Sequence, residues 1–255
     1  MNITGNTIFI PGATSGIGLA LALRFQAKGN TVIIGGRRAA LLDELAQRHG
    51  FDTVQLDTAD AASITAAARE VLATHPSLNV VIAMAGIMRA EDWHSPAGFL
   101  ASAEQTVTTN LLGPIRLFAA FVEHLQAQAD ATFVTVSSGL AHTPLRVTPS
   151  YNATKAAIHM LTESLRLQLS DTSVKLLELV PPAVATELMP GQSENPIAMP
   201  LDAYVDEVMQ LIEAQPDTHE ILVERVGFLR FAEVRGDYDQ VVAAVNSTDR
   251  HAASA

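Results

Sequence analysis

An apolar run followed directly by closely spaced glycines opens the chain: Thr7-Ile8-Phe9-Ile10-Pro11-Gly12-Ala13-Thr14-Ser15-Gly16-Ile17-Gly18. The β-branched residues at 7–10 predict a strand, and the apolar periodicity that follows predicts a helix from Leu19 to about Lys28. A second strand is expected at Thr31–Ile34. Strand, glycine turn, helix and strand make a βαβ unit, in which the strands lie parallel with a right-handed crossover. The opening stretch therefore predicts an α/β fold.

The same alternation of strands and helices continues along the chain. Further strands are predicted at 52–56, 80–84, 131–136, 174–180 and 221–223, and helices at 39–48, 61–73, 101–128, 150–170, 201–214 and 228–245. A loop is expected at 187–200 and a frayed tail at 246–255. We therefore expect one domain over residues 1–255, a single-domain Rossmann fold with a doubly wound, seven-stranded parallel sheet and helices on both faces.

Gly12, Gly16 and Gly18 follow the spacing G-x-x-x-G-x-G rather than the G-x-G-x-x-G dinucleotide fingerprint. The physical logic is similar, because glycine lets the backbone approach a phosphate and the N-terminus of the next helix attracts an anion. The stretch therefore predicts a phosphate-binding loop. The alternative is a glycine turn with a purely structural role.

The end of the second strand bears on the choice of cofactor. Enzymes that bind a free ribose 2′-hydroxyl usually place an acidic residue there, but this chain reads Gly35-Gly36-Arg37-Arg38. An arginine fork suits a 2′-phosphate, so we expect NADP(H) to be preferred over NAD(H). The alternative is that both arginines only cover the start of the helix at 39–48.

Tyr151 and Lys155 lie four residues apart at the start of a predicted helix and therefore share one face. A nearby ammonium favours the phenolate, so we expect Lys155 to lower the pKa of Tyr151 against the opposing effect of burial. The pair would then serve as a general acid and base near neutral pH. A chance pairing of two surface residues is the alternative.

Two other polar positions are candidates for the same site. Ser138 follows the strand at 131–136, at the carboxyl end where ligands of open α/β sheets bind. Its neighbour Ser137 should face away because strand side chains alternate. Asn110 interrupts the predicted helix at 101–128, and we interpret it either as a tolerated surface residue or as a functional residue that bends the helix.

Bulk composition excludes several classes of function. The net charge of −11 argues against a nucleic-acid partner. The apolar stretch 80–88 is far shorter than the roughly 20 residues of a membrane span. The first residues lack a secretory signal and cysteine is absent, so we expect a cytoplasmic protein. The eight histidines include no His-x-x-x-His pair, so we expect no metal site.

Taken together, the glycine loop, Ala85-Gly86, Asn110, Ser138 and the Tyr151-x-x-x-Lys155 pair resemble the short-chain dehydrogenase/reductase family. The resemblance covers nearly the whole chain, in the family's order. Within the family, the stretches 137–141, 148–151, 153–159 and 180–182 are similar to a group of DltE-like oxidoreductases.

The resemblance implies a role for each matching residue. Tyr151 would exchange a proton with the substrate oxygen, Lys155 would lower the tyrosine pKa and hold the nicotinamide ribose, and Ser138 would bind the substrate oxygen. Asn110 would position a water molecule, and Thr186 would contact the nicotinamide. The expected cofactor-binding residues are Gly12, Thr14, Ser15, Gly16, Ile17, Gly18, Arg37, Arg38, Asp57, Ala85, Gly86, Tyr151, Lys155, Pro181, Val184 and Thr186.

The expected partner is a small carbonyl or alcohol substrate, bound by a mostly apolar pocket. The candidate substrate residues are Ser138, Leu140, His142, Trp93 and Met189, with Met88, Leu145 and Met199 nearby. The resemblance also implies a homodimer or homotetramer through the helices at 101–128 and 150–170. A non-catalytic NADPH-binding regulatory protein on the same fold is the alternative, because a fold does not fix a function.

Three departures from the family pattern stand out. Ala83-Met84 replaces the usual Asn-Asn, Pro182 replaces a common Gly, and Pro11 replaces a common Thr. We expect the first to affect stability more than catalysis.

Overall fold

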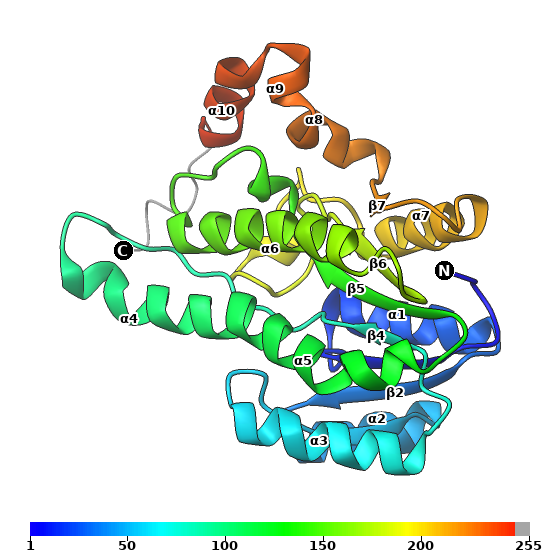
Figure 1. The fold of residues 1–255 in the computed structure, drawn as a ribbon. Coiled ribbons are helices and arrows are strands. Elements are labelled where there is room, and N and C mark those ends of the chain that lie inside the picture. Colours follow the sequence, from blue (N-terminus) through cyan, green and yellow to red (C-terminus); the bar gives the residue numbers. More distant parts are fainter. Residues whose placement is uncertain (248–255) are drawn as a thin grey trace.

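Seven parallel strands form one sheet through the middle of the molecule, in the order β3-β2-β1-β4-β5-β6-β7 (Figure 1). The computed structural model describes residues 1–247. Because β1 pairs with both β2 and β4, the strand order reverses there, and ligands of such sheets bind at a reversal. The strands are β1 (Thr7–Pro11), β2 (Thr31–Gly36), β3 (Asp52–Gln55), β4 (Val80–Ile82), β5 (Ala131–Val136), β6 (Val174–Leu179) and β7 (Glu220–Ile221).

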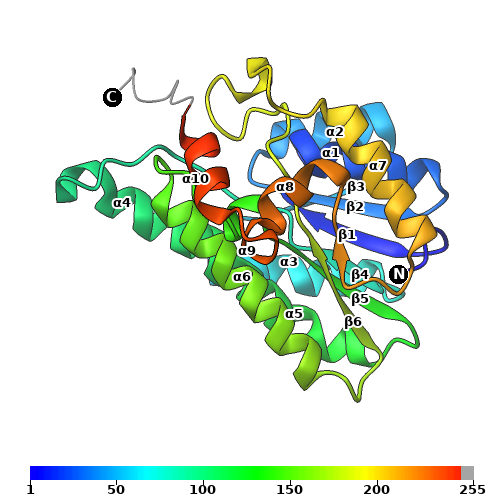
Figure 2. The same ribbon diagram turned by 90° about the horizontal axis from the view of Figure 1, so that it is seen from above.

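Helices cover both faces of the sheet, which confirms the predicted doubly wound architecture (Figure 2). The helices are α1 (Gly16–Ala27), α2 (Ala39–His49), α3 (Ala61–Thr74), α4 (Pro96–Val107), α5 (Gly113–Gln126), α6 (Pro149–Gln168), α7 (Leu201–Ala214), α8 (Gly227–Arg230), α9 (Ala232–Arg235) and α10 (Tyr238–Asn246). Side chains of α1, α2 and α7 pack into one core, and those of α3, α5 and the end of α6 into the other.

Alternate side chains of each strand enter opposite cores. Ile8 and Ile10 of β1 lie in the core with α1 and α7, whereas Phe9 lies in the core with α3 and α5. Val134 and Phe133 of β5 divide in the same way. Every residue of β1 and β5 is buried, which explains the nearly continuous apolar sequence of these strands.

The single helix predicted at 101–128 is wrong, because three elements occupy that stretch. α4 begins earlier, at Pro96, and the π-helical turn η1 (Thr108–Leu112) separates it from α5. Pro114 lacks the N–H that would donate to the carbonyl of Asn110 in an α-helix. The α-helical hydrogen-bond pattern is therefore replaced by a π-helical one over Thr108–Leu112.

The single helix predicted at 228–245 is also wrong. It is divided into α8, α9 and α10, which lie above α6 in Figure 1, and Gly236 ends α9 with φ of +78°. Asn246, where the predicted frayed tail begins, is the last residue of α10. The Asn246 side chain accepts from the amide of Arg146 (2.7 Å) and donates to the carbonyl of Pro144 (3.0 Å). The rest of the predicted tail, 248–255, lies outside the described residues.

No helix within residues 1–247 is both long enough and apolar enough to cross a membrane.

Gly12 offers a test of how closely the glycine loop approaches the segment after β4. It has φ of +93°, and a Cβ there would lie 2.6 Å from the Ala85 backbone, whereas Gly50 has φ of +73° with open space around it. Gly12→Ala is expected to lower the free energy of unfolding by about 3 kcal/mol, from strain and overlap together, and Gly50→Ala by about 1 kcal/mol. Urea unfolding measures both. Equal losses would contradict the close approach at Gly12.

Candidate active site

Helix α6 carries the two central residues of the site in its first two turns. Pro149 starts the helix, where its missing N–H costs nothing. Tyr151 and Lys155 are both buried, with 7% and 6% of their surface exposed. The Lys155 ammonium lies 5.4 Å from the centre of the Tyr151 ring and donates a 2.7 Å hydrogen bond to the carbonyl of Val136, the last residue of β5.

Burial controls the protonation of both residues. It raises the pKa of Tyr151 to about 12, although the nearby Ser138 hydroxyl acts in the opposite direction. It lowers the pKa of Lys155 to about 8, against the attraction of the Glu178 carboxylate. The expected lowering of the Tyr151 pKa by Lys155 is therefore wrong for this structure, because desolvation outweighs the effect of the ammonium. At neutral pH the phenol keeps its proton.

Ser138 stands directly beside this pair, where β5 gives way to the 3₁₀ turn η2 (Gly139–Ala141). Its hydroxyl oxygen accepts from the amide of Leu140 at 3.1 Å and donates a long 3.5 Å bond to the carbonyl of Pro181. The hydroxyl of Ser137 is buried and, among residues 1–247, has no hydrogen-bond partner. Ser137 therefore does not share the contacts of Ser138.

Asn110 lies in the η1 turn and is almost fully buried, so its interpretation as a surface residue is wrong. Its side-chain oxygen accepts from the amide of Ile87 (2.8 Å), and its nitrogen donates to the carbonyl of Ile87 (2.8 Å) and to the Thr154 hydroxyl (3.4 Å). A Cβ at Gly86 would lie 3.4 Å from Asn110 Oδ1 and 3.9 Å from Lys155 Nζ. Asn110 thus fixes the segment after β4 against the first turns of α6.

The glycine loop fits the phosphates of a dinucleotide. The amide of Gly12 donates to the carbonyl of Gly35 (2.8 Å), and α1 begins behind Ser15 with no side-chain cap and no acidic residue in its first turn. Free N–H groups at such a helix start attract an anion. Thr186, far along the chain, lies over the loop, with its Cγ2 3.6 Å from a Cβ built at Gly16. A side chain at Gly36 would overlap Thr14, at 2.5 Å.

One of the two arginines after β2 contacts this loop. Arg38 donates to the Thr14 hydroxyl at 3.1 Å, and the Arg37 carbonyl accepts from Gln55 at 3.0 Å. No ion pair joins either guanidinium to a carboxylate of residues 1–247. Asp57 accepts from the amide of Ala59 (2.9 Å), which begins the turn toward α3, and its expected contact with adenine stays a prediction.

The last cofactor candidates lie where the chain leaves β6 and β4. The Pro181 carbonyl accepts from the amide of Gly139 (2.9 Å), and Val184 pairs with Met199. Met84, which stands in the place of a family asparagine, approaches the glycine loop, with its Cγ 3.0 Å from a Cβ built at Gly18.

Only part of the predicted substrate set gathers at Tyr151. Met88, Tyr151 and Met189 form a buried cluster against which Leu140 and Leu145 pack. Trp93 lies outside it, half exposed and stacked on Phe99 with ring centres 4.1 Å apart. His142 also lies outside the cluster, with its ring against His159 at 4.7 Å.

Glu91 is a positioning residue that the sequence analysis missed. Its carboxylate accepts from the amide of Ser150 (3.1 Å), from Ser102 (2.9 Å) and from Trp93 (3.0 Å). The residue before the first turn of α6, Thr148, makes no side-chain cap hydrogen bond. Glu91 therefore caps the start of this helix, next to Tyr151. Burial acts to raise the pKa of Glu91, but these hydrogen bonds outweigh it and the pKa is lowered. Nothing in the spacing from 91 to 150 signals the contact.

Comparison with known proteins identifies the family. The sequence profile of the short chain dehydrogenase family matches residues 6–196. The chain therefore belongs to this family, and it is an NAD(P)-dependent oxidoreductase. It is 38% identical over 252 residues to the uncharacterized oxidoreductase DltE of Bacillus subtilis (strain 168). The matched region covers 98% of this chain and 100% of DltE.

Two further relatives place the chain more broadly. It is 31% identical to the 2,3-dihydro-2,3-dihydroxybenzoate dehydrogenase of Escherichia coli (strain K12), over 74% of this chain and 73% of that one. Among solved structures, a short chain dehydrogenase from Burkholderia cenocepacia J2315 in complex with NADP shares the fold. Its TM-score is 0.79 at 22% identity, over 96% of this chain and 98% of that one.

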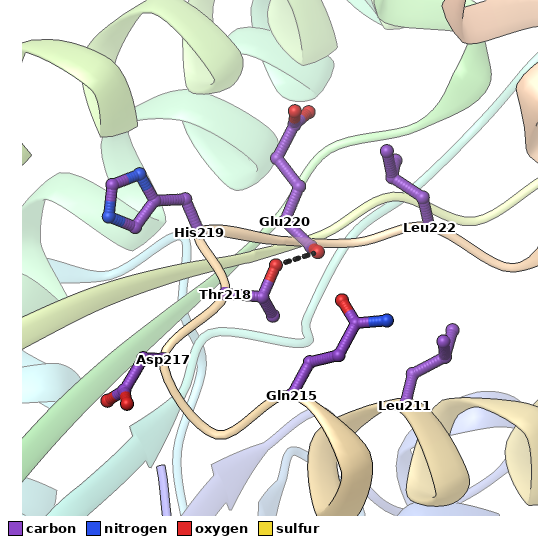
Figure 3. Close-up of a pocket in the computed structure, with 7 residues that line it drawn as sticks. All are labelled: Leu211, Gln215, Asp217, Thr218, His219, Glu220 and Leu222. Atoms are coloured by element: carbon purple, nitrogen blue, oxygen red, sulfur yellow. Dashed lines mark hydrogen bonds between the residues drawn. The ribbon is translucent and has the colours of Figure 1, made fainter.

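A separate cavity of about 410 Å³ lies away from these residues, between the end of α7 and the start of β7 (Figure 3). Asp217 on its rim pairs with Lys175, the second residue of β6, so the cavity lies at the amino end of that strand. The candidate active site lies at the opposite, carboxyl end. The cavity is lined by Leu211, Gln215, Asp217, Thr218, His219, Glu220 and Leu222.

Removing the Glu91 carboxylate should destabilise the fold in a pH-dependent way. Glu91→Ala is expected to lower the free energy of unfolding at pH 7 by about 1 kcal/mol, as for a lost helix cap. Because the pKa of Glu91 is lowered on folding, its contribution is present above the ordinary glutamate pKa and is lost as pH falls through the folded value. The difference between the variant and the unaltered protein should shrink from pH 7 to about pH 4.

Denaturant unfolding at both pH values makes this measurement, with Glu104→Ala on exposed α4 as the control. A loss at pH 7 no greater than that of the control would contradict the capping role.

Proposed function

We propose that the protein interconverts a ketone or aldehyde with an alcohol, uses NADP(H), and employs Tyr151 as its general acid and base. The observation that supports this most directly is the buried group of Ser138, Tyr151 and Lys155 at the carboxyl end of β5, beside the apolar cluster of Met88 and Met189. Such a site excludes water from a proton and hydride exchange.

Each residue has a part that follows from its position. A bound nicotinamide supplies or accepts the hydride. The Ser138 hydroxyl would bind the substrate oxygen, and the Tyr151 hydroxyl would give its proton to that oxygen in reduction and take it back in oxidation. Lys155 would stabilise the phenolate left after the proton transfer, since its ammonium is held near the Tyr151 ring. The high pKa of Tyr151 keeps the proton in place until that moment.

The role of Asn110 in positioning a water molecule stays a prediction. Its side-chain amide bonds both backbone groups of Ile87 and therefore orders the wall of the site. That contact is compatible with a part in a proton path but does not require one.

The preference for NADP(H) rests on Arg37 and Arg38. Both follow the end of β2, and Arg38 donates to the Thr14 hydroxyl. No carboxylate of residues 1–247 is paired to either guanidinium. A 2′-phosphate bound there would have two cations available, and a planar guanidinium forms bidentate hydrogen bonds with phosphate.

The apolar cluster favours a substrate with an apolar body, and the loop at 187–200 places Met189 in that cluster. We also propose a cytoplasmic location and a homodimer or homotetramer. Leu100, Val107, Ile115, Met160 and Leu167 are exposed along α4, α5 and α6, the helices expected to associate.

Tyr151→Phe tests the chemistry. With any apolar ketone or aldehyde that the unaltered protein reduces, the variant should lose about 10²–10⁴-fold in kcat while still binding NADPH, because only the transferable proton is removed. Tyr238→Phe, on exposed α10, is the control and should keep full activity. Unchanged kcat in Tyr151→Phe would overturn the assignment. Tight NADPH binding with no reduction across a broad carbonyl panel would favour a non-catalytic NADPH-binding protein instead.

Arg37→Ala and Arg38→Ala test the cofactor preference by isothermal titration with NADPH and NADH. Each variant should weaken NADPH binding about 10-fold or more, which corresponds to about 1.4 kcal/mol, and leave NADH binding nearly unchanged. Arg48→Ala, at the other end of α2, is the matched control. Equal affinity of the unaltered protein for both cofactors would contradict the preference.

A further inference from the structure

A group of histidine and glutamate side chains gathers from the β5–α6 connection, α6 and β7. His142 follows η2, His159 lies on α6, and Glu220 begins β7. One potential ligand atom from each of these three residues lies within 4.8 Å of the other two. None of the three belongs to the apolar cluster around Tyr151.

His142 presents an unexplained buried atom to this group. Its Nε2 is buried and has no hydrogen-bond partner in residues 1–247. Leaving a buried polar atom unpaired costs its full desolvation, so such an atom requires an explanation. Burial, with the charges of Arg230 and His159, lowers the pKa of His142 to about 4. The ring is therefore neutral at physiological pH, and one of its nitrogens carries a free lone pair.

Glu178 orients His159 for the same role. This carboxylate of β6 is fully buried, and its two oxygens lie 2.9 and 3.1 Å from His159 Nδ1. A carboxylate that accepts from one ring nitrogen of a histidine directs the other toward a ligand, the arrangement found around protein-bound metals. The same carboxylate raises the pKa of His159, so a cation has to compete with a proton there.

Glu220 completes the group with a negative charge. Its side chain points away from Leu211 and Gln215 of α7 (Figure 3), and Arg230 holds both of its oxygens, at 2.9 and 3.0 Å. Each carboxylate oxygen keeps a further lone pair for a second partner. With neutral histidines, the carboxylates of Glu163, Glu178 and Glu220 outweigh the guanidinium groups of Arg166 and Arg230 by one negative charge, which favours a cation.

We propose that His142, His159 and Glu220 bind a divalent transition-metal ion of the zinc type, with Glu178 and Arg230 orienting two of the ligands. Two imidazoles and one carboxylate are the donors that Zn²⁺ accepts in proteins, and they leave a fourth position for water. The expectation of no metal site came from spacing along one helix, whereas these ligands come from three separate elements. The ion would tie the segment after Ser138 to α6 and β7. This proposal does not depend on the proposed reaction.

The test is isothermal titration of the chelator-treated full chain with ZnCl₂. One equivalent should bind saturably, and Zn²⁺ at about 100 times its Kd should raise Tm by about 5 °C or more, because an ion that binds only the folded state stabilises it. MgCl₂ should do neither, since nitrogen ligands suit Mg²⁺ poorly. His142→Gln should weaken Zn²⁺ binding at least about 10-fold.

His219→Ala, one residue before Glu220 and outside the group of ligands, is the matched control and should bind Zn²⁺ normally. The visible absorption of Co²⁺ bound to the unaltered protein gives a reading that needs no substitution, because nitrogen and oxygen ligands in a tetrahedral arrangement produce an intense spectrum. Absence of saturable Zn²⁺ binding would overturn the proposal. Equal Zn²⁺ affinity of His142→Gln and the unaltered protein would also overturn the proposal, because the ion would then bind adventitiously elsewhere.

Discussion

The burial of an ammonium and a phenol side by side is the constraint on which the rest of the site depends. Lys155 is taken out of water with one strong hydrogen bond, to the carbonyl of Val136, and with the face of the Tyr151 ring nearby. Desolvation favours the neutral form of each residue, so it raises the pKa of Tyr151 and lowers the pKa of Lys155. This arrangement persists only if β5 ends at Val136 and α6 starts at a fixed place above it.

Two contacts from distant parts of the chain fix that start, and a third joins the ends of β5 and β6 beside it. Asn110 ties the segment after β4 to the first turns of α6 through Ile87 and Thr154. Glu91 binds the amide of Ser150. Ser138 lies between the amide of Leu140 and the carbonyl of Pro181, which joins the ends of β5 and β6. The site is therefore rigid because backbone groups of several loops converge on one helix end, as preorganised catalysis requires.

The sequence predicted the parts that depend on local pattern. The apolar strands β1 and β5, the glycine loop, and the shared face of Tyr151 and Lys155 all follow from neighbouring residues. It failed where a nearby turn or proline interrupts an apolar pattern that suits one helix, and where a distant group decides. The rewinding at η1 reflects Pro114 acting on Asn110, and the breaks after α8 and α9 reflect local turns within an apolar pattern that suits one helix. The raised pKa of Tyr151 depends on how deeply the fold buries it, and the contacts of Glu91 and His142 join residues with no sequence relation.

The most direct test of Tyr151 as the acid and base is its ionisation, followed by ultraviolet difference spectroscopy of the phenolate. Tyr204 and Tyr238 are the only other tyrosines, so subtraction of the Tyr151→Phe spectrum isolates the signal. Alone, the protein should show no ionisation of Tyr151 below about pH 10, because burial raises its pKa. Saturating NADP⁺ should lower that pKa by about two units or more, as an added positive charge beside Lys155 favours the phenolate. An unchanged pKa with NADP⁺ bound would contradict the account.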